Sequence, residues 1–344
     1  MLFAIRSIVD LSSPSFWILN CASLISKISI CCVLPTPWVS VRMCLHPQTI
    51  LFIVYINDLP RCVKQCSVNM YADDTVLYLA GPSVHSLIFY INHDLQCLSE
   101  WLEDNNLVFT VSKTKCVLFK SQRHKERDCI LNLDLLGKSI SCENPFKYLG
   151  VVFDNFMTWK AHADYVCKKV VSRVNILGRV RSFVTKEAAT LVHNTLTLPL
   201  FDYCDIAWSS LLQQDINWLQ HLQNRSARII TSCSPSSEAK EQLHWPTLSS
   251  RRSYVYHKAK LVFLGLHSLV PSYFSLYFTR FSNIHNYSTK QSMRLSLPNV
   301  KHEKFGKRTF LFTGTKIFNN LPLTIVKSGN IQTFCRWARH FFLS

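Results

Sequence analysis

Two adjacent carboxylates, Asp73 and Asp74, stand between two runs of residues that favour β-strands. The runs Val68–Tyr71 and Thr75–Tyr78 are mainly β-branched, apolar or aromatic. Because Asp-Asp is poor strand material, the pattern predicts a tight hairpin with both acids at its tip. Two carboxylates at such a tip can share hard divalent cations through oxygen, as phosphoryl-transfer chemistry requires. A solvated acidic turn gives the same local pattern, so the pair alone leaves both interpretations open.

The chain is strongly basic. Its 344 residues include 38 Lys and Arg against 21 Asp and Glu, a formal net charge of +17. Residues 245–344 hold 15 of these cations and a single acid, Glu303. The expected partner is therefore a polyanion, with nucleic acid in first place and an anionic membrane surface as the rival.

The cysteines and one apolar stretch give information on the cellular compartment of the protein. Fourteen cysteines are scattered without a Cys-x-x-Cys pair, so neither a zinc ribbon nor a disulfide framework is predicted. We interpret them as free thiols of an intracellular protein, nuclear or cytoplasmic and not secreted. Residues 16–34 could pass for a weak membrane span, but Lys27 near the middle would be costly in a bilayer, so a buried segment is favoured.

Apolar periodicity predicts the elements around the hairpin. After the break at Gly81-Pro82, apolar residues recur at helical spacing from Leu87 to Leu102, which predicts an amphipathic helix that starts at Ser83. An apolar run before the hairpin is expected to end at Pro60. Strand-like runs follow at 107–111, 116–120, 131–136, 139–141 and 146–154, and helical periods follow at 159–180, 185–200 and 218–230.

Several segments together resemble, in order and spacing, the reverse transcriptase of non-LTR (LINE-type) retrotransposons. They are Leu51–Pro60, Tyr71–Asp74, Trp101–Leu118 and Lys147–Gly150. The resemblance implies an α+β fold, with a partial polymerase palm of antiparallel sheet and helices, followed by a mostly helical thumb and a C-terminal extension. It implies RNA-directed DNA synthesis by two-metal phosphoryl transfer, with Mg²⁺ or Mn²⁺ as cofactor. The implied partners are an RNA template, a DNA primer and deoxynucleoside triphosphates.

The same resemblance implies roles for single residues in the palm. Asp73 would be a direct metal ligand and Asp74 a supporting one. Lys113 would approach the triphosphate, where a lysine neutralises charge or donates a proton, and an exposed turn lysine is the alternative. The segment Tyr148, Leu149 and Gly150, expected as a strand that glycine interrupts, would lie beside the primer end.

The helical period that begins at Trp159 is rich in cations. It holds five bases and no acid from residue 168 to residue 181: Lys168, Lys169, Arg173, Arg179 and Arg181. Such a helix suits contact with a phosphate backbone, as the thumb of the resembled family does, and a solvated basic face is the alternative.

The first 50 residues depart from the family pattern. The family needs a further aspartate on an earlier palm strand, and only Asp10 precedes Asp58. Pro47-Gln48 resembles the family's Pro-Gln-Gly loop without its glycine. We therefore expect a truncated copy with little or no polymerase activity, and a noncatalytic basic RNA- or DNA-binding protein is the alternative. The expected regions are a divergent segment at 1–50, a palm remnant at 51–158, a thumb-like region at 159–232 and a basic aromatic extension at 233–344.

Overall fold

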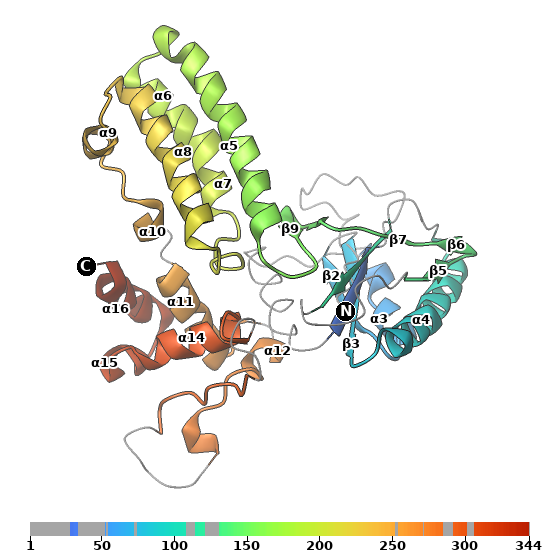
Figure 1. Ribbon diagram of the computed structural model, residues 1–344. Coiled ribbons are helices and arrows are strands. Elements are labelled where there is room, and N and C mark those ends of the chain that lie inside the picture. Colours follow the sequence, from blue (N-terminus) through green and yellow to red (C-terminus); the bar gives the residue numbers. More distant parts are fainter. Residues whose placement is uncertain are drawn as a thin grey trace. The chain divides into compact units, whose positions relative to one another are not determined.

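The chain is divided into two compact units between Thr158 and Trp159. The computed structural model describes residues 28–33, 52, 54–71, 74–107, 114–120, 131–251, 254–270, 272–284, 292–300 and 306–343. We call the described residues from 28 to 158 the sheet unit and those from 159 onward the helical unit (Figure 1). Sheets and helices together agree with the predicted α+β class. Residues 159–232 and 233–344 lie in one compact unit, and their division into thumb and extension stays a prediction.

A five-stranded sheet forms the framework of the sheet unit, with the strand order β2-β3-β1-β4-β7. The strands are β1 (Ile28–Val33), β2 (Ser67–Tyr71), β3 (Asp74–Gly81), β4 (Lys115–Phe119) and β7 (Ser141–Cys142). The central strand β1 is antiparallel to both β3 and β4, whereas β4 and β7 are parallel. Consequently β3 and β4 run in the same direction and begin at the same end of the sheet. The described partners of β4 are β1 and β7, and most of the strand-like run at 107–111 lies outside the described residues.

The strand β1 lies in the segment for which the sequence shows no clean period. Its partners are far along the chain, since Val33 pairs with Val76 and with Lys115. No turn links it to a neighbouring strand, so only the assembled sheet identifies it. β1 also lies within the apolar stretch 16–34, whose other residues are outside the described part. Within the described part of the chain, no helix is both long and apolar enough to cross a bilayer.

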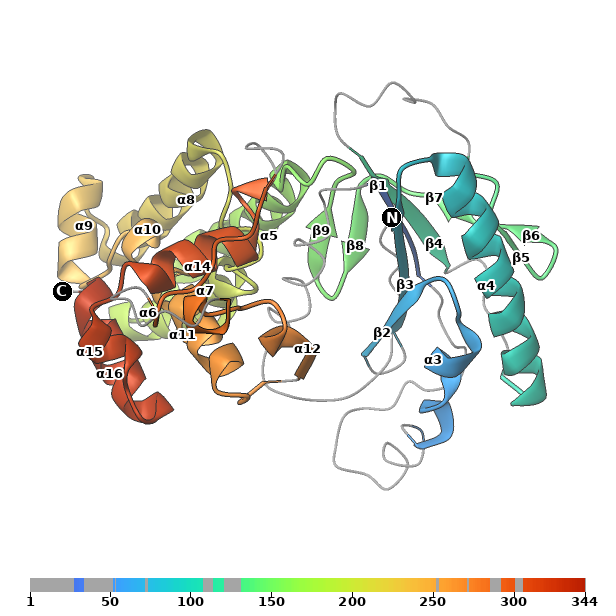
Figure 2. The ribbon, with the colours of Figure 1, turned by 90° about the horizontal axis from the view of Figure 1, so that it is seen from below.

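One face of the sheet is covered by α4 (Val84–Asp104), which confirms the predicted amphipathic helix. Its inward residues, Leu87, Ile91, Leu95 and Leu98, are almost completely buried. A Cβ at Gly81 would come within 3.0 Å of Leu87, so the absence of a side chain there lets helix and strand approach closely. Figure 2 shows α4 on one side of the sheet and the small β8–β9 hairpin on the other.

Short elements complete the sheet unit. Residues 54–56 are helical and a turn follows at 57–58, so the apolar run ends before Pro60 as expected. Pro60 itself lies in the first turn of the short helix α3 (Leu59–Cys62), where its missing N–H costs nothing. The hairpins β5–β6 and β8–β9 have two-residue turns with positive φ at both positions, 54° and 69° at Leu136-Gly137 and 43° and 79° at Leu149-Gly150. The strands of these hairpins are β5 (Asp134–Leu135), β6 (Lys138–Ser139), β8 (Phe146–Tyr148) and β9 (Val151–Phe153).

Two long helices, α5 (Lys160–Val180) and α8 (Gln213–Thr231), pack side by side in the helical unit (Figure 1). Both agree with the predicted helical periods. The helix expected at 185–200 is interrupted, because five residues, His193–Thr197, form a π-helical segment just before Pro199. A wider turn there accommodates the proline ring, which would clash with the preceding turn of a regular helix. The segment between the long helices is made of η2 (Arg181–Phe183), α6 (Lys186–Val192), η3 (His193–Thr197) and α7 (Leu198–Asp202).

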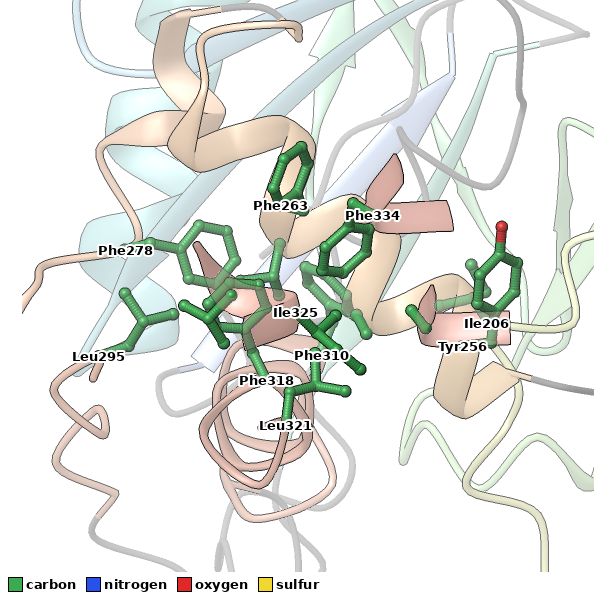
Figure 3. Close-up of a cluster of buried hydrophobic side chains, with 14 of the residues drawn as sticks. Ile206, Tyr256, Phe263, Phe278, Leu295, Phe310, Phe318, Leu321, Ile325 and Phe334 are labelled. Atoms are coloured by element: carbon green, nitrogen blue, oxygen red, sulfur yellow. The ribbon is translucent and has the colours of Figure 1, made fainter. Parts of the chain in front are cut away.

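An aromatic core joins the C-terminal helices (Figure 3). It includes Phe263, Phe310, Phe318 and Phe334, and the rings of Phe263 and Phe334 stack with centroids 4.2 Å apart. Most aromatic residues of the C-terminal region with described side chains therefore serve packing. The helices here are α9 (Ser236–Gln242), α10 (Leu248–Arg251), α11 (Tyr254–Leu266), α12 (Ser272–Ser275), η4 (Phe281–Asn283), α14 (Phe310–Asn319), α15 (Leu323–Val326) and α16 (Ile331–Leu343).

Candidate functional site

The predicted acidic hairpin is confirmed in its strands. β2 and β3 are antiparallel, and the pair of residues nearest the tip is Tyr71 opposite Asp74. Asp74 is the first residue of β3 and is only 7% exposed. Asp73 lies outside the described residues, so its role as a direct metal ligand stays a prediction.

The sheet register fixes the face on which Asp74 lies. Alternation along β3 puts Asp74 on the same face as Val76, and Gly81, which approaches α4, on the opposite face. Val76 and Lys115 are both paired with residue 33 of the central strand, so they share a face. Asp74 and Lys115 are therefore two strands apart at one end of the sheet, roughly 10 Å across it, on the face away from α4.

The lysine at this end of the sheet has carboxylate and hydroxyl partners. Lys115 Nζ lies 2.7 Å from Glu143 Oε1 and donates a hydrogen bond of 3.1 Å to Ser141 Oγ. These contacts direct the charge of Lys115 towards β7. Lys113, the residue expected to approach a triphosphate, lies outside the described residues and stays a prediction.

The β8–β9 hairpin is on the same face as Asp74. Phe119 follows Lys115 by four residues on β4, so both point to one side, and the ring of Phe119 contacts Phe153 of β9 edge to face with centroids 6.3 Å apart. Leu149 and Gly150 form the turn, which needs the left-handed conformation that glycine adopts freely. Tyr148 is buried, so any contact of this hairpin with a primer would come mainly from its turn.

A buried acid holds the start of the β2–β3 hairpin in place. Asp94 of α4 is completely buried, and its carboxylate accepts hydrogen bonds from the backbone N–H groups of Lys64, Gln65 and Cys66, at 3.2, 2.8 and 2.6 Å. These three residues directly precede β2. Charge-assisted bonds of this kind are among the stronger ones in proteins, so Asp94 sets where β2 begins. The sequence signal was an acid between Ile91 and Leu95, on the apolar face of a predicted helix.

The carboxylate that the resemblance requires from an earlier strand is absent from β1. This strand neighbours β3 and reads Ile-Ser-Ile-Cys-Cys-Val, without Asp or Glu. In the described ranges, no three His, Cys, Asp or Glu side chains are grouped so that they could hold a metal ion. Asp74 suits a cation as an oxygen ligand, but the described residues do not complete a two-cation site.

The cations of α5 do not share one face. Lys168 and Arg179 are eleven residues apart, about three turns, and both are exposed on one side, whereas Lys169 points about 100° away and lies 4.6 Å above the ring of Tyr165. Arg173 is half-buried. Arg181 donates from Nε to the carbonyl of Ile230 at 2.8 Å and from Nη1 to that of Val184 at 3.0 Å. These bonds give Arg181 a structural role, and the phosphate contacts of all five cations stay predictions.

Comparison with known families gives the class of protein to which this architecture is related. Residues 40–153 match the family described as Reverse transcriptase (RNA-dependent DNA polymerase). The match includes the acidic hairpin, α4, β4 and the β8–β9 hairpin, and it ends on the last residue of β9. No solved structure matches the chain.

The curated relatives are polymerases of retrotransposons. The chain is 25% identical over 195 residues to the "Retrovirus-related Pol polyprotein from type-1 retrotransposable element R1" of Bradysia coprophila, a match that covers 53% of the chain and 19% of the relative. It is 24% identical over 191 residues to the "Probable RNA-directed DNA polymerase from transposon X-element" of Drosophila melanogaster, covering 54% and 21%. Identity to the "RNA-directed DNA polymerase from mobile element jockey" of the same species is 21% over 191 residues, covering 53% and 20%. The matches span about a fifth of these relatives, and they confirm the resemblance to non-LTR reverse transcriptases over part of the chain.

Proposed function

We propose that the chain is a retroelement-derived polypeptide that combines a reverse-transcriptase palm remnant with a helical nucleic-acid-binding unit and has weak or no polymerase activity. The observation that supports this proposal best is the β2–β3 hairpin. Its strand pair nearest the tip is Tyr71 and Asp74, and it lies within the family match. Asp74 is on the sheet face against which the β8–β9 hairpin packs. Its family chemistry is RNA-directed DNA synthesis.

The expectation of weak polymerase activity follows from β1, the strand that pairs with β3 of the hairpin. Divalent cations, when bound, would neutralise the charge that develops on a transferred phosphoryl group, and Asp73 and Asp74 would be their ligands. Two adjacent carboxylates without a third from β1 should hold a pair of cations poorly. We therefore expect this chain to position a nucleic acid better than it extends one.

A noncatalytic RNA- or DNA-binding role is the second candidate, and the same observation on β1 favours it. The net charge of +17 supports either function, because both require a polyanionic partner. RNA template, DNA primer and nucleoside triphosphates are thus the proposed partners of an active form, and nucleic acid alone is the proposed partner of an inactive one.

Primer extension separates the two candidates. The full chain is incubated with an RNA template, a DNA primer, deoxynucleoside triphosphates and Mg²⁺ or Mn²⁺, next to Asp73→Ala and the control Asp104→Ala, which changes an exposed acid on α4. Incorporation that disappears in Asp73→Ala but persists in the control supports a residual enzyme. No incorporation by any form, together with salt-sensitive binding of the template, supports the binding role. A chain that neither incorporates nucleotides nor binds nucleic acid contradicts both.

A further inference from the structure

We propose that the adjoining outer faces of α5 and α8 form a binding surface for single-stranded nucleic acid, with Trp218 stacking on an unpaired base. This inference deepens the proposed nucleic-acid-binding function and rests on it. It concerns the α5–α8 surface, which we define by Lys168 and Arg179 of α5 and by Trp218, His221 and Arg225 of α8.

Polar contacts show that the two helices run side by side in the same direction. Near their beginnings, Lys160 Nζ lies 3.4 Å from Asp215 Oδ1. Farther along, Arg225 Nη2 donates a hydrogen bond of 2.7 Å to Asn175 Oδ1. Beyond the end of α5, Arg181 bonds the carbonyl of Ile230. The order of these contacts is the same on both helices, which lie side by side in Figure 1, so residues on their adjoining edges are neighbours.

Helical geometry places the five residues of the α5–α8 surface on that shared side. On α5, Lys168 and Arg179 lie within about 40° of Asn175, which contacts Arg225. On α8, Trp218 and His221 lie within about 40° of Arg225, and Trp218 and Arg225 are about 10 Å apart along the helix. The buried residues Leu219 and Ile230 of α8 lie about 100° or more around the helix from all three.

The exposed tryptophan is the most informative part of the surface. Trp218 is 52% exposed, although other residues of the helix form the core. Its ring is nearly parallel to that of His221, with an interplanar angle of 7° and centroids 5.5 Å apart. The histidine thus supports the indole in a fixed orientation. A flat, exposed and oriented aromatic ring is the kind of group on which the bases of single strands stack.

The cations of the α5–α8 surface specify the rest of the partner. Lys168, Arg179 and Arg225 supply three cations, and the acid on this side of α5, Asp164, lies 2.9 Å from Lys160. Cations beside a stacking ring match a chain that carries both phosphates and unpaired bases. In a duplex the bases are already stacked on each other, so a duplex would use the cations and not the tryptophan.

Binding of two oligonucleotides by the full chain tests the proposal. A fluorescent oligo(dT) of 16 nucleotides and a labelled 16-base-pair duplex are titrated separately, with anisotropy as the readout. Trp218→Ala is expected to weaken binding of the single strand by about 5- to 160-fold, the range typical of one stacked base, and to leave the duplex within twofold. Trp218→Phe should retain most single-strand affinity. The matched control is Phe89→Ala, which removes a 69% exposed ring from α4 and should change neither.

The charge variants separate this inference from the function on which it rests. Lys168→Gln with Arg179→Gln should weaken binding of both probes and reduce their salt dependence. If those changes weaken binding while Trp218→Ala binds oligo(dT) like the wild type, the stacking role is wrong and the proposed function stands. If the wild type binds neither probe, both are wrong. If Trp218→Ala does not fold, Trp218→Leu replaces it in the same comparison of oligo(dT) and duplex binding, because leucine keeps an apolar side chain without a flat ring.

Discussion

The sheet unit and the helical unit differ in the kinds of contact that stabilise each of them internally. In the sheet unit, strand pairing and a few polar contacts connect segments that are far apart along the chain, in addition to the apolar face that α4 packs on the sheet. Asp94 bonds residues 28 to 30 positions earlier, and β1 pairs with β4. In the helical unit, apolar helix faces and a cluster of aromatic rings pack together, so many residues each contribute part of the stability. We therefore expect the loss of one polar side chain such as Asp94 to matter more in the sheet unit than the loss of one polar side chain in the helical unit.

The two units also differ in where the reverse-transcriptase family match lies and in where the excess of basic residues lies. The family match at residues 40–153 lies in the sheet unit, where the candidate carboxylates are. The C-terminal hundred residues, with 15 cations and one acid, are in the helical unit. The family match is thus confined to the sheet unit, whereas the matches to the curated relatives cover more than half of the chain and extend into the helical unit.

The largest effect is expected from Asp94→Ala. The change leaves three backbone N–H groups next to β2 without their acceptor, one of them on the buried residue Cys66, so the free energy of unfolding of the sheet unit should fall by about 3 kcal/mol or more. Hydrogen exchange of peptides from each unit measures this, and Asp104→Ala on the same helix is the control. Equal loss of protection in both units would contradict a role of Asp94 that is confined to the sheet unit.

A buried lysine provides the corresponding test in the helical unit. Lys258 of α11 is 5% exposed and bonds the hydroxyl of Thr313 at 3.1 Å. Desolvation lowers the pKa of Lys258 from 10.5 to about 8, partly opposed by the charge of Asp205. Because burial disfavours the charged form, Lys258→Met should stabilise this unit at pH 7, by up to about 3 kcal/mol.

The sign of the pH dependence distinguishes this cause from a change in packing. Between pH 8 and 10.5 the unfolded lysine holds its proton while the folded one has lost it, so the wild type gains stability as pH rises. Lys258→Met lacks this gain, and its advantage should shrink towards pH 10. Urea midpoints at pH 7 and pH 10 measure the difference, with the exposed Lys327→Met as control. An advantage that is the same at both pH values would rule out desolvation as the cause.

Local signals were sufficient for much of the fold. The acidic hairpin, α4, α5 and α8 each appear in the sequence as a period or a turn signal, and the structure contains all four. β1 could not be predicted, because its pairing exists only after distant segments meet. The buried positions of Asp94 and Lys258 depend likewise on what packs against their helices.

The candidate site was predictable only in part for the same reason. The hairpin strands are consecutive in sequence, so their pairing was evident from residue types. Arg181 follows the last residue of α5, and its bonds to the carbonyls of Ile230 and Val184 depend on the packing of α8. A run of basic residues indicates a positively charged surface, but it does not show which of these residues bind backbone carbonyls of the protein itself instead of facing solvent.

A smaller effect is expected at the turn of the β8–β9 hairpin. Gly150 has a φ of 79°, where a side chain is strained, so Gly150→Ala should destabilise the sheet unit by about 1 kcal/mol. Gly150→Asn should cost less, because asparagine tolerates this conformation better. Thermal unfolding measures both, with Gly329→Ala, where a Cβ meets nothing within 4 Å, as the control. Equal losses for Ala and Asn would indicate a steric cause in place of a conformational one.

The smallest and most local effect is expected from Thr185→Ala. The hydroxyl of Thr185 accepts a hydrogen bond of 3.2 Å from the N–H of Ala188 and caps the start of α6. Its loss should cost about 1 kcal/mol, and Thr185→Ser should cost much less. Since α6 is one of several helices that share the packing of this unit, hydrogen exchange should become faster at the first turn of α6 and remain unchanged in α5 and α8. Faster exchange throughout the helical unit would mean that a single polar tie controls it as well, and the contrast with Asp94 would then disappear.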